Sequence, residues 1–405
     1  MNKTETWIYI LLAVISTFLL IDRFLLPCAI VMGIMLGLLV FRDLKLRLSK
    51  LLTALLIIAS LIVITLGMSI FPEFSKLINL NTSVKELLRV VVYIMVLQTM
   101  AMINLDIRTH LTVWTIITVI TAVIVILQFT KIVDMNGMLI SFYGYSKQFV
   151  RAEESNLSMF RGGSVFVNPN VFACFLAAML ANYLFALRFV KESVISKIIM
   201  FTLLMTSLIL SGSRTGMVLA LLLILYHVYS TSQKKHRVFT RNALLIVAAL
   251  AVVVFVLREG FSIDLLGLSD LRMFRIEEGM EDSLGIKLEL FTNMLKEMNI
   301  TNLFFGYGAY DYTKNIEHMV DFDLGYFLTY FGLFGFGAYL LLLRGIYKWG
   351  DYTLAGRKKL NMMLILIMLV FGLTAGIYFN LRMFTVCVVV FMPSLNDMKM
   401  KQRLT

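Results

Sequence analysis

Long apolar runs dominate this chain and alternate with short polar stretches. A helix needs about 20 apolar residues to cross the roughly 30 Å hydrocarbon core of a bilayer, and shorter runs can borrow flanking residues. Such runs occur at 8–21, 24–41, 51–71, 87–103, 111–129, 171–187, 198–210, 215–229, 243–257, 324–343, 362–379 and 383–395. The pattern predicts an all-α integral membrane protein, a single polytopic domain over 1–405 with about 12 transmembrane helices.

Composition agrees with this pattern. The mean hydropathy is +0.86, and charged residues make up 15% of the chain. Soluble domains average about 25% charged residues, so a soluble globular protein is excluded.

Basic residues gather in alternate loops, which sets the expected orientation. These loops and ends hold Lys3, Arg42, Lys45, Arg47, Lys50, Arg108, Arg188, Lys191, Lys197, Lys234, Lys235, Arg237, Arg241, Arg344, Lys348, Arg357, Lys358, Lys359, Lys399, Lys401 and Arg403. The positive-inside rule makes them cytoplasmic, with both termini on that side of the cytoplasmic (inner) membrane. The overall charge of +12 therefore follows topology, and no nucleic-acid partner is expected.

The same topology leaves two long external loops, 130–163 and 258–322. Arginines near the outer helix ends suit a diphosphate ligand, because a guanidinium binds phosphate with two parallel hydrogen bonds. The candidates for substrate binding are Arg151, Arg161, Arg214, Arg272 and Arg275. No His, Asp and Glu set has metal-ligand spacing, so neither a metal nor a cofactor is expected.

Two of these arginines lie beside predicted helix starts. Arg214 follows Ser-Gly-Ser and opens an apolar helix, where its charge opposes the helix dipole unless an anion is bound. Arg161 precedes Asn168-Pro169-Asn170, a helix start whose free N–H groups favour an anion or a hydroxyl-rich ligand. A tight turn in the first case, and helix capping alone in the second, are the structural alternatives.

The end of the large loop holds the candidate general bases. A turn at Gly306-Tyr307-Gly308 precedes His318 and Asp323, and Asp323 stands where the next apolar run begins. A carboxylate or an imidazole at such a position could accept a proton from a substrate hydroxyl.

Three stretches, 161–173, 211–216 and 306–335, resemble in order and sidedness the O-antigen ligase and polymerase superfamily, most of all its Wzy-type polysaccharide polymerases. The Arg-x10-Gly pattern of these polymerases fits Arg151 to Gly162, but the large loop holds no second copy, which weighs against a strict two-loop mechanism. The related ligases carry a histidine at the helix entry. Asp323 stands there in this chain, which favours a polymerase.

The resemblance implies a metal-independent membrane glycosyltransferase with a fold of the GT-C type. It would polymerise undecaprenyl-diphosphate-linked oligosaccharide repeat units into a surface polysaccharide, such as O-antigen or capsule, on the outer face of the cytoplasmic membrane. Asp323 would be the base, with His318 as the alternative, while Arg151, Arg161, Asn168, Asn170, Arg214, Arg272 and Arg275 would bind substrate. Its partners would be membrane lipids and the chain-length regulator and flippase of the same pathway.

Two other functions remain open at this point. One is an O-antigen ligase that transfers glycan to lipid A core or to protein. The other is a transporter, a flippase for the same lipid-linked oligosaccharide. A coupled transporter usually carries ionisable residues in the middle of the membrane, and this sequence has almost none there.

Overall fold

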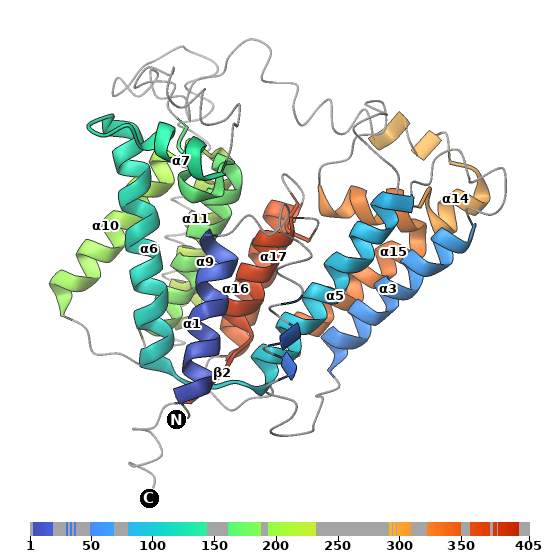
Figure 1. Ribbon diagram of the computed structural model, residues 1–405, viewed down its shortest axis with the longest axis horizontal. Helices are drawn as coiled ribbons and strands as arrows, with labels where there is room; N and C mark the ends of the chain where they lie inside the picture. The colour runs from blue at the N-terminus through green and yellow to red at the C-terminus, as the bar shows by residue number, and fades with distance from the viewer. Residues whose placement is uncertain are drawn as a thin grey trace, which may run out of the picture. The chain divides into compact units, whose positions relative to one another are not determined.

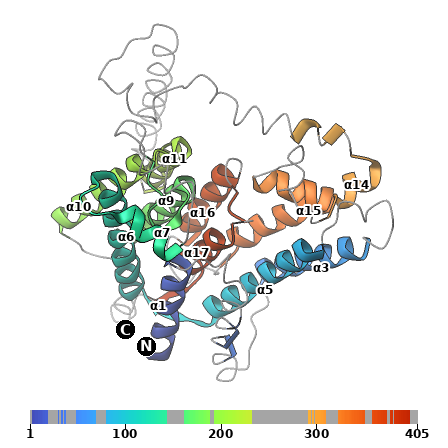
Figure 2. The same ribbon diagram turned by 45° about the horizontal axis from the view of Figure 1, so that its top comes forward.

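The computed structural model describes residues 3–18, 30, 33–34, 36–37, 49–68, 80–143, 161–187, 193–231, 291–293, 295–296, 298–308, 322–349, 357–372, 376–378 and 380–396 (Figures 1 and 2). The chain forms two compact units. Unit 1 combines Met1–Ile117 with Gly279–Thr405, and unit 2 is Thr118–Glu278. The predicted apolar run 243–257 and most of 24–41 lie outside the described residues.

Unit 1 is built from helices of both chain ends. They are α1 (Lys3–Phe18), α3 (Lys50–Met68), α5 (Leu80–Met102), α14 (Ile300–Phe305), α15 (Asp323–Tyr347), α16 (Arg357–Gly372) and α17 (Leu381–Phe391). Helix α15 packs against α3, and α17 packs against α1 and α5. Two three-residue strands, β1 (Asn104–Asp106) and β2 (Ser394–Asn396), pair in parallel, a small addition to the predicted all-α fold.

The described elements of unit 2 are all helices. Helix α6 (Ile107–Thr130) enters it from unit 1 and is followed by α7 (Met135–Tyr143) and the short 3-10 helix η2 (Ser164–Phe166). Helices α9 (Pro169–Ala186), α10 (Val194–Leu210) and α11 (Arg214–Thr231) complete it, and α9 packs against both α10 and α11.

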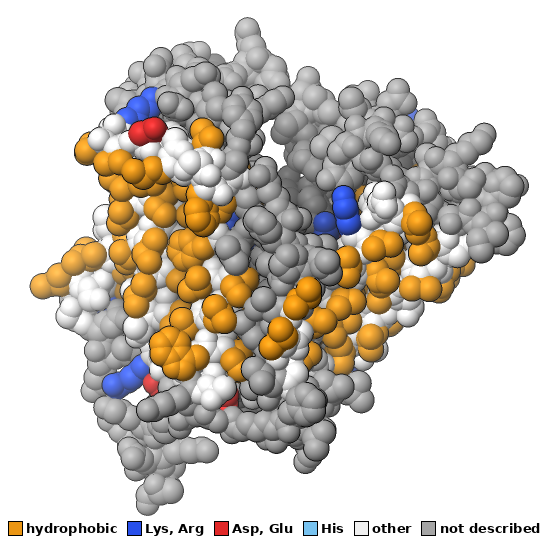
Figure 3. All heavy atoms as spheres, viewed as in Figure 1, with side chains coloured by type: hydrophobic (Ala, Val, Ile, Leu, Met, Phe, Trp, Pro, Cys, Tyr) orange, Lys and Arg blue, Asp and Glu red, His pale blue; other side chains and the backbone are white. Residues whose placement is uncertain are grey.

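Five described helices are long and apolar enough to cross a membrane. These candidate spans are Lys50–Gly67, Ile107–Thr130, Pro169–Ala186, Arg214–Thr231 and Asp323–Tyr347. Large apolar side chains also cover the visible outer faces of the helices (Figure 3), and Ile195, Ile198 and Ile199 of α10 are each more than half exposed. Such faces suit lipid rather than water, so the chain has the make-up of a multi-pass membrane protein.

Different hydrogen bonds mark the two ends of unit 1. At the end that we call the Asp323 end, Arg382 donates to the carbonyl of Thr17, and the Asp323 carboxylate accepts from the backbone between α16 and α17. At the opposite Arg357 end, the Arg357 guanidinium donates to the carbonyls of Phe391 and Pro393. Burial lowers the pKa of Arg357 to about 10, so this side chain stays charged at neutral pH.

Several basic residues of unit 1 that sequence patterns placed in cytoplasmic loops lie at the Arg357 end. Gly345 contacts the backbone of Leu51, and the β1–β2 pair joins the residues just before Arg108 to those just after α17. The described residues that share this end include Lys50, Arg108, Arg344, Lys348, Arg357, Lys358 and Lys359. The described residues of unit 1 that were predicted to share one side of the membrane therefore lie at one end of this unit.

Two helix boundaries of unit 1 differ from the apolar runs. Helix α16 ends at Gly372 although the apolar run continues to 379. The N–H groups of Ile377 and Tyr378 donate to the Asp323 carboxylate and not to a preceding turn of helix. Helix α5 begins at Leu80, seven residues before the run at 87–103, and so includes the charged Glu86. A hydropathy scan detects the apolar core of a helix and misses such polar ends.

Helix α15 is broken at Gly332, whose backbone angles are φ 60° and ψ −150°. The break frees the carbonyls of Thr329 and Tyr330. These accept the N–H groups of Tyr307 at 2.7 Å and of Gly308 at 3.0 Å, from the segment that follows α14. A free carbonyl in apolar surroundings is costly, so this segment stabilises the break.

Close backbone contact at the break requires glycine on both sides. A Cβ atom on Gly306, which has φ +73°, would overlap the backbone of Tyr330, and one on Gly332 would overlap the backbone of Phe304. The predicted turn at Gly306-Tyr307-Gly308 is confirmed, and the structure adds that its backbone is bonded to the broken helix.

We expect Gly332→Ala to lower the melting temperature of the purified protein in detergent. Its backbone region is open almost only to glycine, which alone costs about 1–3 kcal/mol for another residue, and the overlap with Phe304 adds to this. Gly337→Ala is the matched control in the same helix. Its Cβ would meet no atom within 4 Å, and alanine favours a helix by about 1 kcal/mol over glycine. Equal melting temperatures for the two variants would contradict the break at Gly332.

Candidate functional site

The predicted helix start at Asn168-Pro169-Asn170 is confirmed in unit 2. Asn168 is the N-cap of α9, its side chain accepts from the N–H of Asn170 at 2.9 Å, and Pro169 is the first helical residue. The side-chain oxygen of Asn170 accepts from Nη2 of Arg161 at 2.8 Å. Asn168 therefore does cap the helix, while Asn170 holds a guanidinium beside the helix N-terminus.

The stretch Ser211 to Gly216 joins α10 to α11 by a tight turn. Gly212 adopts φ +59°, and the Ser213 hydroxyl oxygen accepts from the N–H of Gly216 at 3.3 Å, at the start of α11. Arg214 is the first residue of α11 and its side chain is exposed. The tight-turn explanation is thus correct for the glycine and the serines, and Arg214 follows this turn at the exposed helix N-terminus.

Two contacts bring these segments together, and we call the region the α9–α11 junction. The N–H of Gly162 donates to the carbonyl of Leu210 at 3.0 Å, and Gly216 lies so close to Ala173 that a Cβ would crowd it. Two helix N-termini and the arginines Arg161 and Arg214 therefore share one neighbourhood of unit 2. Positive helix ends and guanidinium groups together favour an anion.

A buried network supports the loop that carries Arg161. The N–H of Ser164 donates to Oε1 of Gln128 at 2.9 Å, and Nε2 of Gln128 donates to Oδ1 of Asn136 at 2.8 Å. Ser164 and Val167 both have positive φ angles, 48° and 65°, an unusual conformation for such residues. Surrounding bonds must hold this conformation, and the sequence alone did not reveal the roles of Gln128 and Asn136.

In unit 1, Asp323 lies at the start of α15 as predicted, and its side chain is fully buried. Oδ2 accepts from the N–H of Ile377 at 2.9 Å, and Oδ1 accepts from the N–H of Tyr378 at 2.9 Å. Both carboxylate oxygens are therefore engaged with backbone. This geometry anchors the 376–378 segment to α15, and the role of Asp323 as a proton acceptor stays a prediction.

A second buried carboxylate lies at the same end of unit 1, where sequence analysis singled out none. Glu86 of α5 accepts from the hydroxyl of Tyr326 at 2.5 Å and from Nη1 of Arg89 at 2.8 Å, both at Oε2. The Tyr326 hydroxyl thus links α15 to α5, and both helices pack against α3 (Figures 1 and 2). The polar start of α5 beyond its apolar run was the one signal in the sequence that could have found this residue.

The predicted site residues thus fall into three groups. Arg161, Asn168, Asn170 and Arg214 come together in unit 2, and Asp323 belongs to unit 1. Arg151, Arg272, Arg275 and His318 lie outside the described residues.

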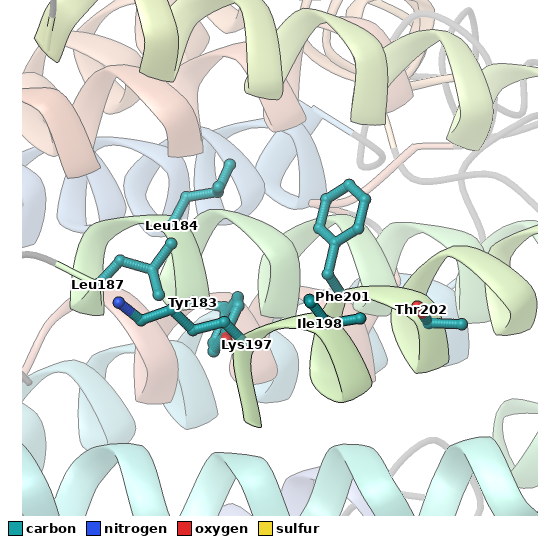
Figure 4. A pocket seen from close by; sticks show the side chains of 7 residues that line it. All are labelled: Tyr183, Leu184, Leu187, Lys197, Ile198, Phe201 and Thr202. Atoms are coloured by element: carbon teal, nitrogen blue, oxygen red, sulfur yellow. The ribbon is translucent and has the colours of Figure 1, made fainter. Parts of the chain in front are cut away.

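A groove of about 290 Å³ opens between the C-terminal part of α9 and the start of α10 (Figure 4). Its lining is Tyr183, Leu184, Leu187, Lys197, Ile198, Phe201 and Thr202. It adjoins the end of α9 opposite Asn170, and among the described residues that line it there is no carboxylate or imidazole. The groove is therefore not the candidate site.

We expect Asp323→Asn to lower the melting temperature, because the amide offers one oxygen where two backbone N–H groups need acceptors. Its NH₂ would face one of these donors, and an unsatisfied buried group costs about 1–3 kcal/mol. Asp134→Asn is the control, since the exposed Asp134 carboxylate accepts only the N–H of Gly137 and asparagine caps equally well. If Asp323→Asn melts at the wild-type temperature, the anchoring role is wrong.

Comparison with known proteins gives a family match for one part of the chain. No curated protein matches it. Residues 198–330, about a third of the chain, match the family model described as O-Antigen ligase. The match runs from α10 through α11 and α14 to Tyr330 of α15, and it includes both Arg214 and Asp323. The resemblance inferred from the motifs is confirmed, and the chain carries an O-antigen ligase domain, the domain of membrane enzymes that transfer lipid-linked glycans.

Proposed function

We propose that this protein is a polysaccharide polymerase that joins undecaprenyl-diphosphate-linked repeat units on the outer face of the cytoplasmic membrane. The observation that carries the proposal is the α9–α11 junction, where Arg161, Arg214 and two helix N-termini lie together in a chain whose residues 198–330 match the O-Antigen ligase family. This arrangement favours an anion. The diphosphate of the donor is the anion that such an enzyme must hold.

The reaction is a displacement at the anomeric carbon of the donor. The acceptor hydroxyl loses its proton as it attacks, and the lipid diphosphate leaves. Arg161 and Arg214 offset the negative charge that grows on this leaving group, which lowers the barrier without a metal ion. The sequence indicates Asp323 and His318 as candidates for the base that accepts the proton of the acceptor hydroxyl.

An O-antigen ligase is the second candidate function. The family that residues 198–330 match is described as O-Antigen ligase, which favours this function. The carboxylate at the start of α15, where the related ligases carry a histidine, favours the polymerase.

The orientation in the membrane is part of the proposal. We place the Arg357 end in the cytoplasm, together with both chain termini, because basic residues gather at this end of unit 1. The chain would span the membrane about 12 times.

A single cysteine placed at Lys358 should resist an impermeant thiol reagent in intact cells and react after the cells are opened. The natural cysteines would first be replaced, since Cys174 and Cys387 are free thiols. A cysteine at Lys85, exposed near the start of α5, should react from outside and is the control. Labelling of the Lys358 position in intact cells would contradict the proposed orientation.

Deletion of the gene should abolish the ladder of long glycans on a gel and leave a single repeat unit on the final acceptor. Loss of every glycan from the final acceptor would instead identify a ligase. Complementation with Arg214→Lys should fail to restore the ladder, because lysine keeps the charge and loses the planar fork that grips a diphosphate.

The control for the arginine is Arg344→Lys, the same change at an exposed position of α15 at the Arg357 end. This variant should restore the full ladder. Arg214→Lys protein that is present at wild-type level and restores a normal ladder would remove Arg214 from the site.

A further inference from the structure

Glu86 is a carboxylate inside an apolar unit, and burial of such a charge costs free energy unless the charge is paired. Its side chain is 7% exposed. Both of its hydrogen bonds, from Tyr326 and from Arg89, go to Oε2. Oε1 accepts no hydrogen bond from any residue that the structure describes. One oxygen of a buried carboxylate is therefore ready to accept a hydrogen from another molecule.

Two buried hydroxyl groups on the same end of unit 1 also lack partners within the described ranges. They are Oγ of Ser83 and the phenolic oxygen of Tyr378. Ser83 precedes Glu86 by one turn of α5 and shares its helix face. The Tyr378 ring lies 6.0 Å from the ring of Tyr326, the residue that donates to Glu86. Buried polar groups are nearly always hydrogen-bonded, so these hydroxyls indicate a polar ligand or water.

We propose that Glu86, Tyr326 and Tyr378 form the binding site for the acceptor hydroxyl, and that Oε1 of Glu86 accepts its proton. The inference rests on the proposed function and names the group that activates the acceptor. The ligand class is a sugar hydroxyl, which can donate to Glu86 while it accepts from Tyr378.

Asp323 is then a positioning residue. Its two oxygens hold the N–H groups of Ile377 and Tyr378, while Tyr93 of α5 donates its hydroxyl to the carbonyl of Tyr378. The backbone of Tyr378 is thereby fixed from α15 and from α5. Both oxygens of Asp323 already accept backbone N–H groups, whereas Oε1 of Glu86 accepts none from the residues that the structure describes.

The proton and the electrons balance in this step. The acceptor oxygen forms a bond to the anomeric carbon of the donor, and the bond from that carbon to the diphosphate oxygen breaks with its electron pair. The hydroxyl proton moves to Glu86 and passes to solvent before the next cycle. Arg89 stays bonded to Oε2 and keeps the carboxylate in place.

The test uses full-length protein in detergent with lipid-linked repeat unit extracted from the deletion strain. Glu86→Gln should lower the initial rate of polymer formation by about 10²–10⁴, the usual effect of removing a general base. Glu86→Asp should recover part of that rate. Tyr378→Phe should raise the half-saturating concentration of repeat unit without lowering the melting temperature, because the hydroxyl that it removes has no partner among the described residues.

Glu5→Gln is the matched control. Glu5 accepts from the backbone N–H of Asn104 at the Arg357 end, and its change to glutamine should leave the rate as it is. If wild-type protein forms no polymer from the repeat unit, the proposed function fails. If the wild type is active and Glu86→Gln keeps the full rate, only the Glu86 inference fails.

Tyr378→Phe separates a folding defect from a loss of chemistry, because it removes no hydrogen bond between the described residues. If Glu86→Gln melts at a lower temperature, the result for Tyr378→Phe decides. An unchanged rate and half-saturating concentration in Tyr378→Phe would mean that the hydroxyl meets water only, and would overturn the site.

Discussion

Backbone hydrogen bonding in apolar surroundings is the constraint on which unit 1 depends. A free carbonyl or N–H group there costs several kcal/mol, so a helix can be interrupted only where something else meets its polar groups. The chain does this twice: Tyr307 and Gly308 take the carbonyls freed at Gly332, and Asp323 takes the N–H groups beyond α16. Both sets of hydrogen bonds involve α15. The position of Tyr326 between them, one turn after Asp323, follows from these two attachments.

Features that depend on local rules could be predicted from the sequence. Asn168 and Pro169 begin a helix because one side chain caps it and the other lacks the N–H that would go unbonded. The starts of α11 at Arg214 and of α15 at Asp323 were predicted from the apolar runs that follow these residues, and the turn at Gly306 was predicted from its glycines. Motif order was enough to indicate the O-antigen ligase family that the comparison found over 198–330.

Features that depend on distant partners could not be predicted. Glu86 and Tyr326 are 240 residues apart, and Tyr93 and Tyr378 are 285 apart. Hydropathy placed Glu86 just outside a span, and no motif joins a lone carboxylate to a tyrosine. The use of Asp323 as a backbone anchor was hidden in the same way, because its partners are N–H groups that every sequence carries. Gln128 and Asn136 support the Arg161 loop through contacts of the same kind.

The discontinuous make-up of unit 1 has a consequence for biosynthesis. Its early helices are made first, the whole of unit 2 follows, and only then do α15, α16 and α17 emerge from the ribosome. During that interval α1 lacks α17, β1 lacks its strand partner, and the Glu86 carboxylate lacks Tyr326. The nascent chain must therefore hold a half-satisfied carboxylate at the membrane until its last helices insert. We expect a membrane insertase that shelters polar helices to stay bound to α5 until α15 is made. Chains that stop before α15 should be degraded.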